Sequence, residues 1–149
     1  MKTISEIIGQ RERYCVNPAQ TVRQAVDYLC EKGAGAVAVC DCEEVVGVFS
    51  ERDLMRRVVA EGRDPDSTYV SDVMSEDIVC VGCDESCDVA QALMLAKKLR
   101  HLIVVDQGNR FQGFVSMREL LVVDLAASKE LIAKLNDDYY DHQFKKLKR

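Results

Sequence analysis

Short apolar blocks recur along the chain in a fixed order, and that order occurs twice. Residues 22–29 carry apolar side chains every three or four positions, which is the spacing of one face of a helix. The continuous apolar run 36–40 indicates a buried strand, and 45–49 follows it across a polar turn. The runs 102–105 and 111–115 repeat this hairpin pattern in the second half. Each half is therefore predicted to be strand, helix, strand, strand, helix.

The two halves also align residue by residue. Val16–Val22 matches Val81–Cys87 at an offset of 65 positions, and Gly47–Leu54 matches Gly113–Leu120 at an offset of 66. The extra residue falls in the polar turn after Asp106, where a duplicated unit tolerates a change of length. We therefore predict an α/β protein built from two tandem β-α-β-β-α repeats.

Polar residues at the block boundaries predict where the helices begin. Thr21 and Ser86 are N-cap residues, and Gln24 completes a capping box with Thr21. Ser71 is expected to cap a short helical turn over residues 70–75.

The helix after each hairpin is predicted to begin at Ser50 in the first half and at Ser116 in the second. The expected apolar face of the first of these helices consists of Leu54, Met55, Val58 and Val59. The boundaries we expect are 1–62 for an N-terminal segment and the first repeat, 63–78 for a linker and short helix, 79–125 for the second repeat and 126–149 for a helical tail.

Composition and charge narrow the class of protein. The chain has 149 residues, of which 48% are hydrophobic, so it can bury a core and a disordered chain is excluded. Its net charge of −5 gives no general attraction to phosphate backbones, so no nucleic-acid partner is expected. The apolar runs are too short for a membrane span, and the N-terminus shows no apolar signal segment. We therefore expect a cytoplasmic protein with no membrane partner and with seven reduced cysteines.

With its elements and motifs in the order described above, each repeat resembles the cystathionine-β-synthase (CBS) domain. The tandem resembles a CBS pair, or Bateman module, of the small stand-alone bacterial type. The resemblance covers residues 3–125 and is carried by Thr21-Val22 with Ala25, by 100–106, by Gly47–Asp53 and by Gly113–Glu119. It implies two repeats related by a pseudo-two-fold axis, with a C-terminal helix beyond them. It also implies a homodimer that binds an adenosine-containing ligand between its repeats.

The segment Ser50-Glu51-Arg52-Asp53 lies where a strand ends and a helix begins, so free backbone N–H groups favour an anion there. The resemblance implies that Ser50 contacts a ligand phosphate and that Asp53 accepts both ribose hydroxyls. Arg52 is a further phosphate candidate. The same Ser-x-x-Asp pattern is also an ordinary capping box, so a purely structural role stays open.

The second repeat carries a variant of this motif. Ser116 aligns with Ser50, but Glu119 is one methylene longer than Asp53. We therefore expect one competent site and one weakened or empty site.

Arg100 and His101 stand before the central strand of the second repeat. The resemblance implies that basic residues here reach ligand phosphates across the cleft; Arg can bind phosphate through two hydrogen bonds, and His is a pH-sensitive donor. An exposed Arg beside a half-buried His at a strand edge is the alternative. Because the first repeat has Gly35 and Ala36 at these places, the expected site combines the basic pair with the segment 50–53.

Five cysteines have spacings that suggest metal ligands, namely Cys40, Cys42, Cys80, Cys83 and Cys87. Cys40 and Cys87 align with valines of the other repeat, so we interpret them as small buried hydrophobic residues and expect no metal site. The alternative is a cysteine-based metal or redox sensor on the same fold, with the equivalent residues Cys15 and Cys80 as redox candidates.

The sequence contains no recognisable catalytic constellation. Its histidines are His101 and His142, and it has no Walker-type phosphate loop, nucleophile elbow or metalloprotease motif. We therefore expect a regulatory module and not an enzyme. The resemblance implies that it takes AMP, ADP, ATP, NAD or S-adenosylmethionine as ligand, without a catalytic cofactor, and signals to a partner protein by a change of conformation. A structural interaction module with empty clefts is a further alternative.

Overall fold

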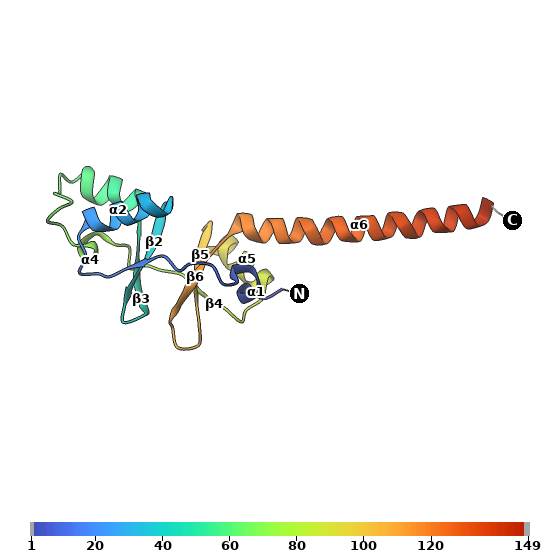
Figure 1. Cartoon of the computed structure of the whole chain (residues 1–149), viewed down its shortest axis with the longest axis horizontal. Coiled ribbons are helices and arrows are strands. Elements are labelled where there is room, and N and C mark those ends of the chain that lie inside the picture. Colours follow the sequence, from blue (N-terminus) through green and yellow to red (C-terminus); the bar gives the residue numbers. More distant parts are fainter. Residues whose placement is uncertain (1, 148–149) are drawn as a thin grey trace.

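The two repeats form two three-stranded sheets of identical topology (Figure 1). The computed structural model describes the backbone of residues 2–147 and the side chains of residues 2–137. The first repeat comprises β1 (Cys15–Val16), α2 (Val22–Lys32), β2 (Ala36–Asp41), β3 (Glu44–Ser50), α3 (Glu51–Asp53) and a π-helical segment, η1 (Leu54–Val59). The second comprises β4 (Cys80–Gly82), α5 (Cys87–Lys97), β5 (His101–Val105), β6 (Phe111–Ser116) and α6 (Met117–Leu147). Two short helices, α1 (Ile4–Ile8) and α4 (Val70–Val73), precede the repeats.

The order of elements in each repeat confirms the predicted β-α-β-β-α unit. The central strand is β2 in one sheet and β5 in the other; each pairs in parallel with the strand before the helix and antiparallel with its hairpin partner. The parallel pairing follows from the helical crossover, and the antiparallel pairing follows from the short polar turn. The chain is thus a mixed α/β protein with two tandem repeats.

The helix starts agree with the sequence except at α4. Thr21 and Gln24 form the predicted capping box of α2, and the Ser86 side chain caps α5. The prediction for Ser71 was wrong, because it lies inside α4 and Tyr69 occupies the N-cap position without a side-chain hydrogen bond. Tyr69 is extended there because its neighbourhood pairs with Thr21 across an isolated β-bridge.

Each short helix packs on the repeat that it does not directly precede. Ile4 and Ile8 of α1 belong to the core of the second repeat, whereas Val70 and Val73 of α4 belong to the core of the first. Backbone bonds fix both helices in the same way, with Ile4 N donating to Glu85 O at 2.9 Å and Val70 N donating to Gln20 O at 2.8 Å. The two repeats are therefore interlocked by an exchange of equivalent segments.

A third apolar cluster joins the sheets face to face. It contains Ala38, Cys40 and Val45 from the first repeat and Ile103, Val105 and Phe111 from the second. Because both faces of β2 and β5 are covered, these strands are continuously apolar, as buried central strands are. The packed sheets hold the two repeats at a fixed spacing, with clefts along their boundary.

The helix after β3 differs from the expectation. Val58 is buried, but Met55 and Val59 are 58% and 69% exposed, so the predicted apolar face was wrong at these two positions. Ala60 N donates to Met55 O at 2.9 Å, which is the i to i+5 bond of a π-helix. The wider turn shifts the side chains away from the 3.6-residue spacing on which the prediction relied.

The helix after β6 and the tail are one continuous helix, α6, which projects away from the rest of the molecule (Figure 1). Leu120 near its start is fully buried, whereas Leu121, Val122 and Leu125 are exposed. The side chain of His142 lies outside the described residues. Among the helices described, none combines the length and apolar character that a bilayer crossing requires.

Candidate functional site

The end of β3 and the start of α3 bring Ser50 and Asp53 together. Both the backbone N–H and the hydroxyl of Ser50 donate to Asp53 Oδ2, at 2.9 and 3.0 Å, and Asp53 N donates back to Ser50 Oγ at 3.4 Å. This is a capping box, so the motif has the structural role that the sequence analysis left open.

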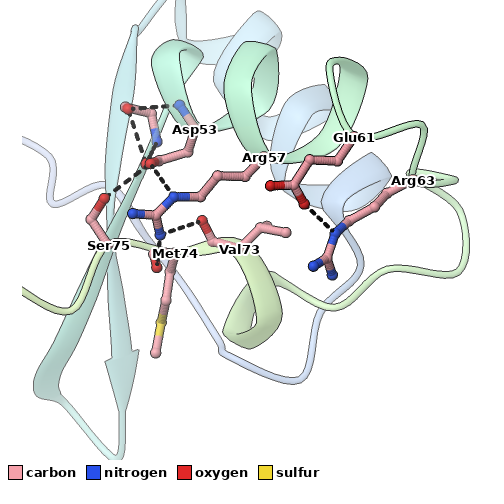
Figure 2. A network of polar contacts seen from close by, with 8 residues as sticks. Asp53, Arg57, Glu61, Arg63, Val73, Met74 and Ser75 are labelled. Atoms are coloured by element: carbon pink, nitrogen blue, oxygen red, sulfur yellow. Dashed lines mark hydrogen bonds and ion pairs between the residues drawn. The ribbon is translucent and has the colours of Figure 1, made fainter.

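The second oxygen of Asp53 is held by residues that the sequence analysis did not identify. Ser75 Oγ donates to Asp53 Oδ1 at 2.9 Å, and Arg57 Nε lies 3.7 Å from the same oxygen. Figure 2 shows Arg57 between Asp53 and the segment after α4, where its Nη1 donates to Met74 O at 2.7 Å and to Val73 O at 3.3 Å. Asp53 is therefore a buried carboxylate in a fixed orientation, with 6% of its surface exposed.

The cap of α3 opens on a cleft between the repeats of about 890 Å³. Its walls bring together five of the six predicted site residues, namely Ser50, Arg52, Asp53, Arg100 and His101. Lys98 and Glu51 also line it. The predicted basic pair thus lies across the cleft from the predicted cap motif, although His101 is already the first residue of β5 and is exposed, not half-buried.

An apolar cleft of about 410 Å³ adjoins the polar one. The two share lining residues from both repeats, among them Ala36, Ser75 and His101. The remainder of the apolar lining includes Tyr14, Val48, Ile78, Ile103 and Phe114. The combined site therefore offers an apolar compartment beside a polar one with several cationic side chains, which suits a ligand that is flat and apolar at one end and anionic at the other.

Ser116 is the predicted site residue that does not line either of these clefts. Its N–H and hydroxyl donate to Glu119 Oε2 at 2.9 and 3.0 Å, which repeats the geometry of the first cap. The other oxygen, Glu119 Oε1, accepts a hydrogen bond from Arg11 Nη1. Arg11 is itself anchored, since its Nε donates to Ile8 O at 2.8 Å and its Nη2 to Ile7 O at 2.9 Å.

Arg11 changes the electrostatics of the second cap. Burial raises the pKa of Glu119, but the hydrogen bonds from Arg11 and Ser116, together with the charge of Arg11, outweigh it and leave that pKa below its usual value. Glu119 is therefore ionised and paired near neutral pH, with its carboxylate already engaged by the protein.

The residues that sequence reasoning missed fall into three groups. Arg57 follows Asp53 by four positions, which is a helical ion-pair spacing and a usable signal. Ser75 and Arg11 come from the segments that are exchanged between the repeats, so only the tertiary fold places them beside the caps. Lys98 ends α5 in a left-handed conformation, with φ of 56°, at a position where glycine is usual.

The cysteines are all free thiols. Burial raises the pKa of Cys40 to about 12, with a further contribution from Cys15, and burial also raises the pKa of Cys80. Thiolate, the reactive form, is therefore scarce at Cys40 and Cys80 near neutral pH. Within the part of the chain whose side chains are described, no three His, Cys, Asp or Glu side chains lie close enough to hold a metal ion.

Comparison with known proteins identifies the family of the two repeats. The family model described as CBS domain matches residues 4–60 and again residues 70–125. The CBS domain-containing protein YhcV of Bacillus subtilis is 35% identical over 107 residues, which are 72% of this chain and 75% of that protein.

Solved structures agree with the fold. A protein with CBS domains from Burkholderia ambifaria superposes with a TM-score of 0.72 at 31% identity, over 84% of this chain and 95% of that one. The CBS domain protein PAE2072 of Pyrobaculum aerophilum, complexed with AMP, has the same fold, with a TM-score of 0.72 at 23% identity over 85% of this chain and 99% of that one. The chain therefore belongs to the CBS-domain family and carries one CBS repeat in each matched segment.

Proposed function

We propose that this CBS pair is a regulatory module that binds an adenosine-containing nucleotide in the cleft at Asp53. The observation that carries the proposal is the convergence of Ser50, Arg52 and Asp53 with Arg100 and His101 on one cleft, from opposite repeats. The AMP in the Pyrobaculum aerophilum protein supports an adenine nucleotide as the ligand class. NAD and S-adenosylmethionine, which also contain adenosine, are further candidates.

The geometry of the cleft supports the roles that the resemblance implies. The apolar compartment takes the adenine base, and the fixed Asp53 carboxylate accepts the ribose hydroxyls. A ribose hydroxyl can replace the Ser75 hydroxyl on Oδ1, because Ser75 also lines the cleft. Ser50, Arg52, Arg100 and His101 contact the phosphates, where the guanidinium groups supply charge and paired donors.

The assembly we propose is a homodimer whose ligand state a partner protein detects. Met55 and Val59 are exposed, and the residues equivalent to them in the second repeat, Leu121 and Leu125, are exposed as well. Large apolar side chains gathered on equivalent faces of two repeats favour a protein interface. Ligand binding between the repeats then changes their mutual angle, and the interface transmits the change.

Thermal unfolding with and without ligand tests the binding site. AMP or ATP at about 100 times its dissociation constant stabilises the protein by about 2.7 kcal/mol, which corresponds to a rise in Tm of about 5–10 °C for a chain of this size. Asp53→Ala is expected to abolish this rise. Because Asp53 also caps a helix, the variant loses about 1 kcal/mol without ligand, and the rise is therefore measured against the baseline of the variant itself.

Glu119→Ala is the matched control. It removes the equivalent cap of the second repeat, and it is expected to retain the full ligand-induced rise. The proposal is contradicted if AMP, ATP, NAD and S-adenosylmethionine all leave the Tm unchanged, or if Asp53→Ala responds to ligand as the wild type does.

A further inference from the structure

In the stretch of α6 from Leu125 to Asp137, where the described side chains end, nothing of the same chain packs against the helix. Every side chain from Asp124 to Asp137 is exposed. An isolated helix in water is marginally stable, and most helices in proteins depend on packing of an apolar face. The same stretch exposes Leu125, Leu131, Ile132 and Leu135, each by more than half of its surface. A helix of this kind requires a partner surface.

The spacing of the exposed residues identifies that partner surface as another helix. Leu121, Leu125, Ile132 and Leu135 follow one another at intervals of four, seven and three residues, with Ser128 between the middle two. These are the d, a, a and d positions of a heptad, and Ser128 is a further d position. An a/d seam of this width is typical of a coiled coil, not of a helix lying on a broad core.

The remaining positions agree with this assignment. Six of the outward positions b, c and f are occupied by small or charged residues, namely Ala126, Ala127, Glu130, Ala133, Lys134 and Asp137, and a seventh by the half-buried Val123. From Leu125 onward the exposed large apolar side chains lie in the seam, with Leu131 beside it at a g position; before Leu125, Val122 is exposed at an e position. A second copy of the same helix presents a seam of the same length and spacing.

Charge decides the direction of the two helices. In a parallel pair, Asp124 at g faces Lys129 at e of the partner, and this attraction occurs twice. In the antiparallel register that pairs Leu125 with Leu135 and Ser128 with Ile132, the e positions adjoin one another, so Lys129 lies beside Lys129 of the second copy, which is repulsive. Asp124 Oδ2 accepts a hydrogen bond from Gln91 Nε2 at 2.6 Å, and its Oδ1 remains available to the partner lysine.

We propose that residues 121–135 of α6 form a parallel, in-register two-stranded coiled coil with the same residues of a second copy of this chain. The proposal concerns assembly and does not depend on nucleotide binding. In this arrangement Ser128 meets Ser128 of the second copy in the seam, whereas Ala127 points away from it.

Cysteine cross-linking of the full chain tests the pairing directly. Ser128→Cys is expected to give a disulfide-linked dimer on mild oxidation, whereas Ala127→Cys is expected to give no more than the background of the wild type with its seven native cysteines. In the antiparallel register residue 128 faces residue 132, so that arrangement does not bring the two introduced thiols together. Equal cross-linking of the two variants, or none above background, overturns the proposal.

A further pair of substitutions distinguishes the seam of the helix from its outward face. Ile132→Glu in the Ser128→Cys chain is expected to lower the yield of cross-linked dimer by about tenfold or more, because the seam would bury an unpaired carboxylate. Ala133→Glu adds the same charge one residue away at an outward position and is expected to leave the yield unchanged. Loss of cross-linking in both variants, or in neither, contradicts the proposal.

Discussion

Asp53 and Glu119 occupy equivalent places and differ in what holds their second oxygen. Asp53 has Ser75 and Arg57, and it borders an open cleft. Glu119 has Arg11, which lies against it as an intramolecular counter-ion. Both carboxylates thus face an arginine, but they differ by one methylene, and Asp53, unlike Glu119, lines the cleft.

The depressed pKa of Glu119 gives a pH dependence of stability with a defined sign. The Arg11 pair contributes fully above the pKa that Glu has in the unfolded chain, about 4.3, and its contribution is lost as the pH falls through the lower folded value. Glu119→Gln is therefore expected to be less stable than the wild type above about pH 5. The gap is about 1 kcal/mol or less, because both partners are partly exposed to solvent.

Urea unfolding of both proteins between pH 3 and pH 7 measures this difference. The gap in the free energy of unfolding is expected to narrow below about pH 4.3. A gap that stays constant over the whole range would show that Arg11 does not set the ionisation of Glu119.

For single residues, the sequence predicts those whose contacts lie close by along the chain. The Ser-x-x-Asp and Ser-x-x-Glu motifs predict both caps, because the bonds span only three positions. The resemblance to the CBS family supplies Arg100 and His101. Ser75 and Arg11 lie beside carboxylates that are 22 and 108 positions away in the chain, so no local pattern predicts them.

Among the elements, α1 and α4 join the two repeats, because each packs in the core of the repeat that it does not directly precede. Each is too short to be stable alone, and each exists because its apolar residues complete the core of the other repeat. The sequence shows that the two segments are alike, but it does not show that they are exchanged. The sequence does not predict the π-helical segment η1 either, because a single widened turn has no distinctive composition.

Because the short helices are exchanged, a substitution in α1 is expected to lower the stability of the second repeat. Ile4 is fully buried, and Ile4→Ala is expected to cost about 2–5 kcal/mol. Native-state hydrogen exchange is expected to show the larger loss of protection in β4–β6, although Ile4 precedes the first repeat. Val70→Ala is the mirror-image control, with the larger loss in β1–β3. Equal loss in both sheets after either substitution would contradict a separate role for each helix.

For the whole molecule, two similar repeats produce two caps with different surroundings. The pseudo-two-fold relation places equivalent caps in both halves, but the basic pair Arg100 and His101 and the counter-ion Arg11 break the symmetry. The repeat could be predicted because duplication leaves a fixed offset in the sequence. The volume and full lining of the clefts could not, because they arise only where the two packed sheets leave space.

This asymmetry predicts one bound nucleotide per chain. Isothermal titration of the wild type with AMP is expected to give a stoichiometry of one. The double substitution Arg11→Ala with Glu119→Asp removes the counter-ion and shortens the carboxylate, and it is expected to add a second site of lower affinity, because this site still lacks a basic pair. Two sites in the wild type, or one site in the double variant, would show that Arg11 is not what closes the second site.

The continuity of α6 has a mechanical consequence. The same helix begins beside the Ser116–Glu119 cap and ends far outside the repeats, so its 31 residues form a rod of about 46 Å. A rotation of about 5° at its base displaces the tip by about 4 Å. A small rotation of the second repeat relative to the first would therefore be amplified into a swing at the far end of α6.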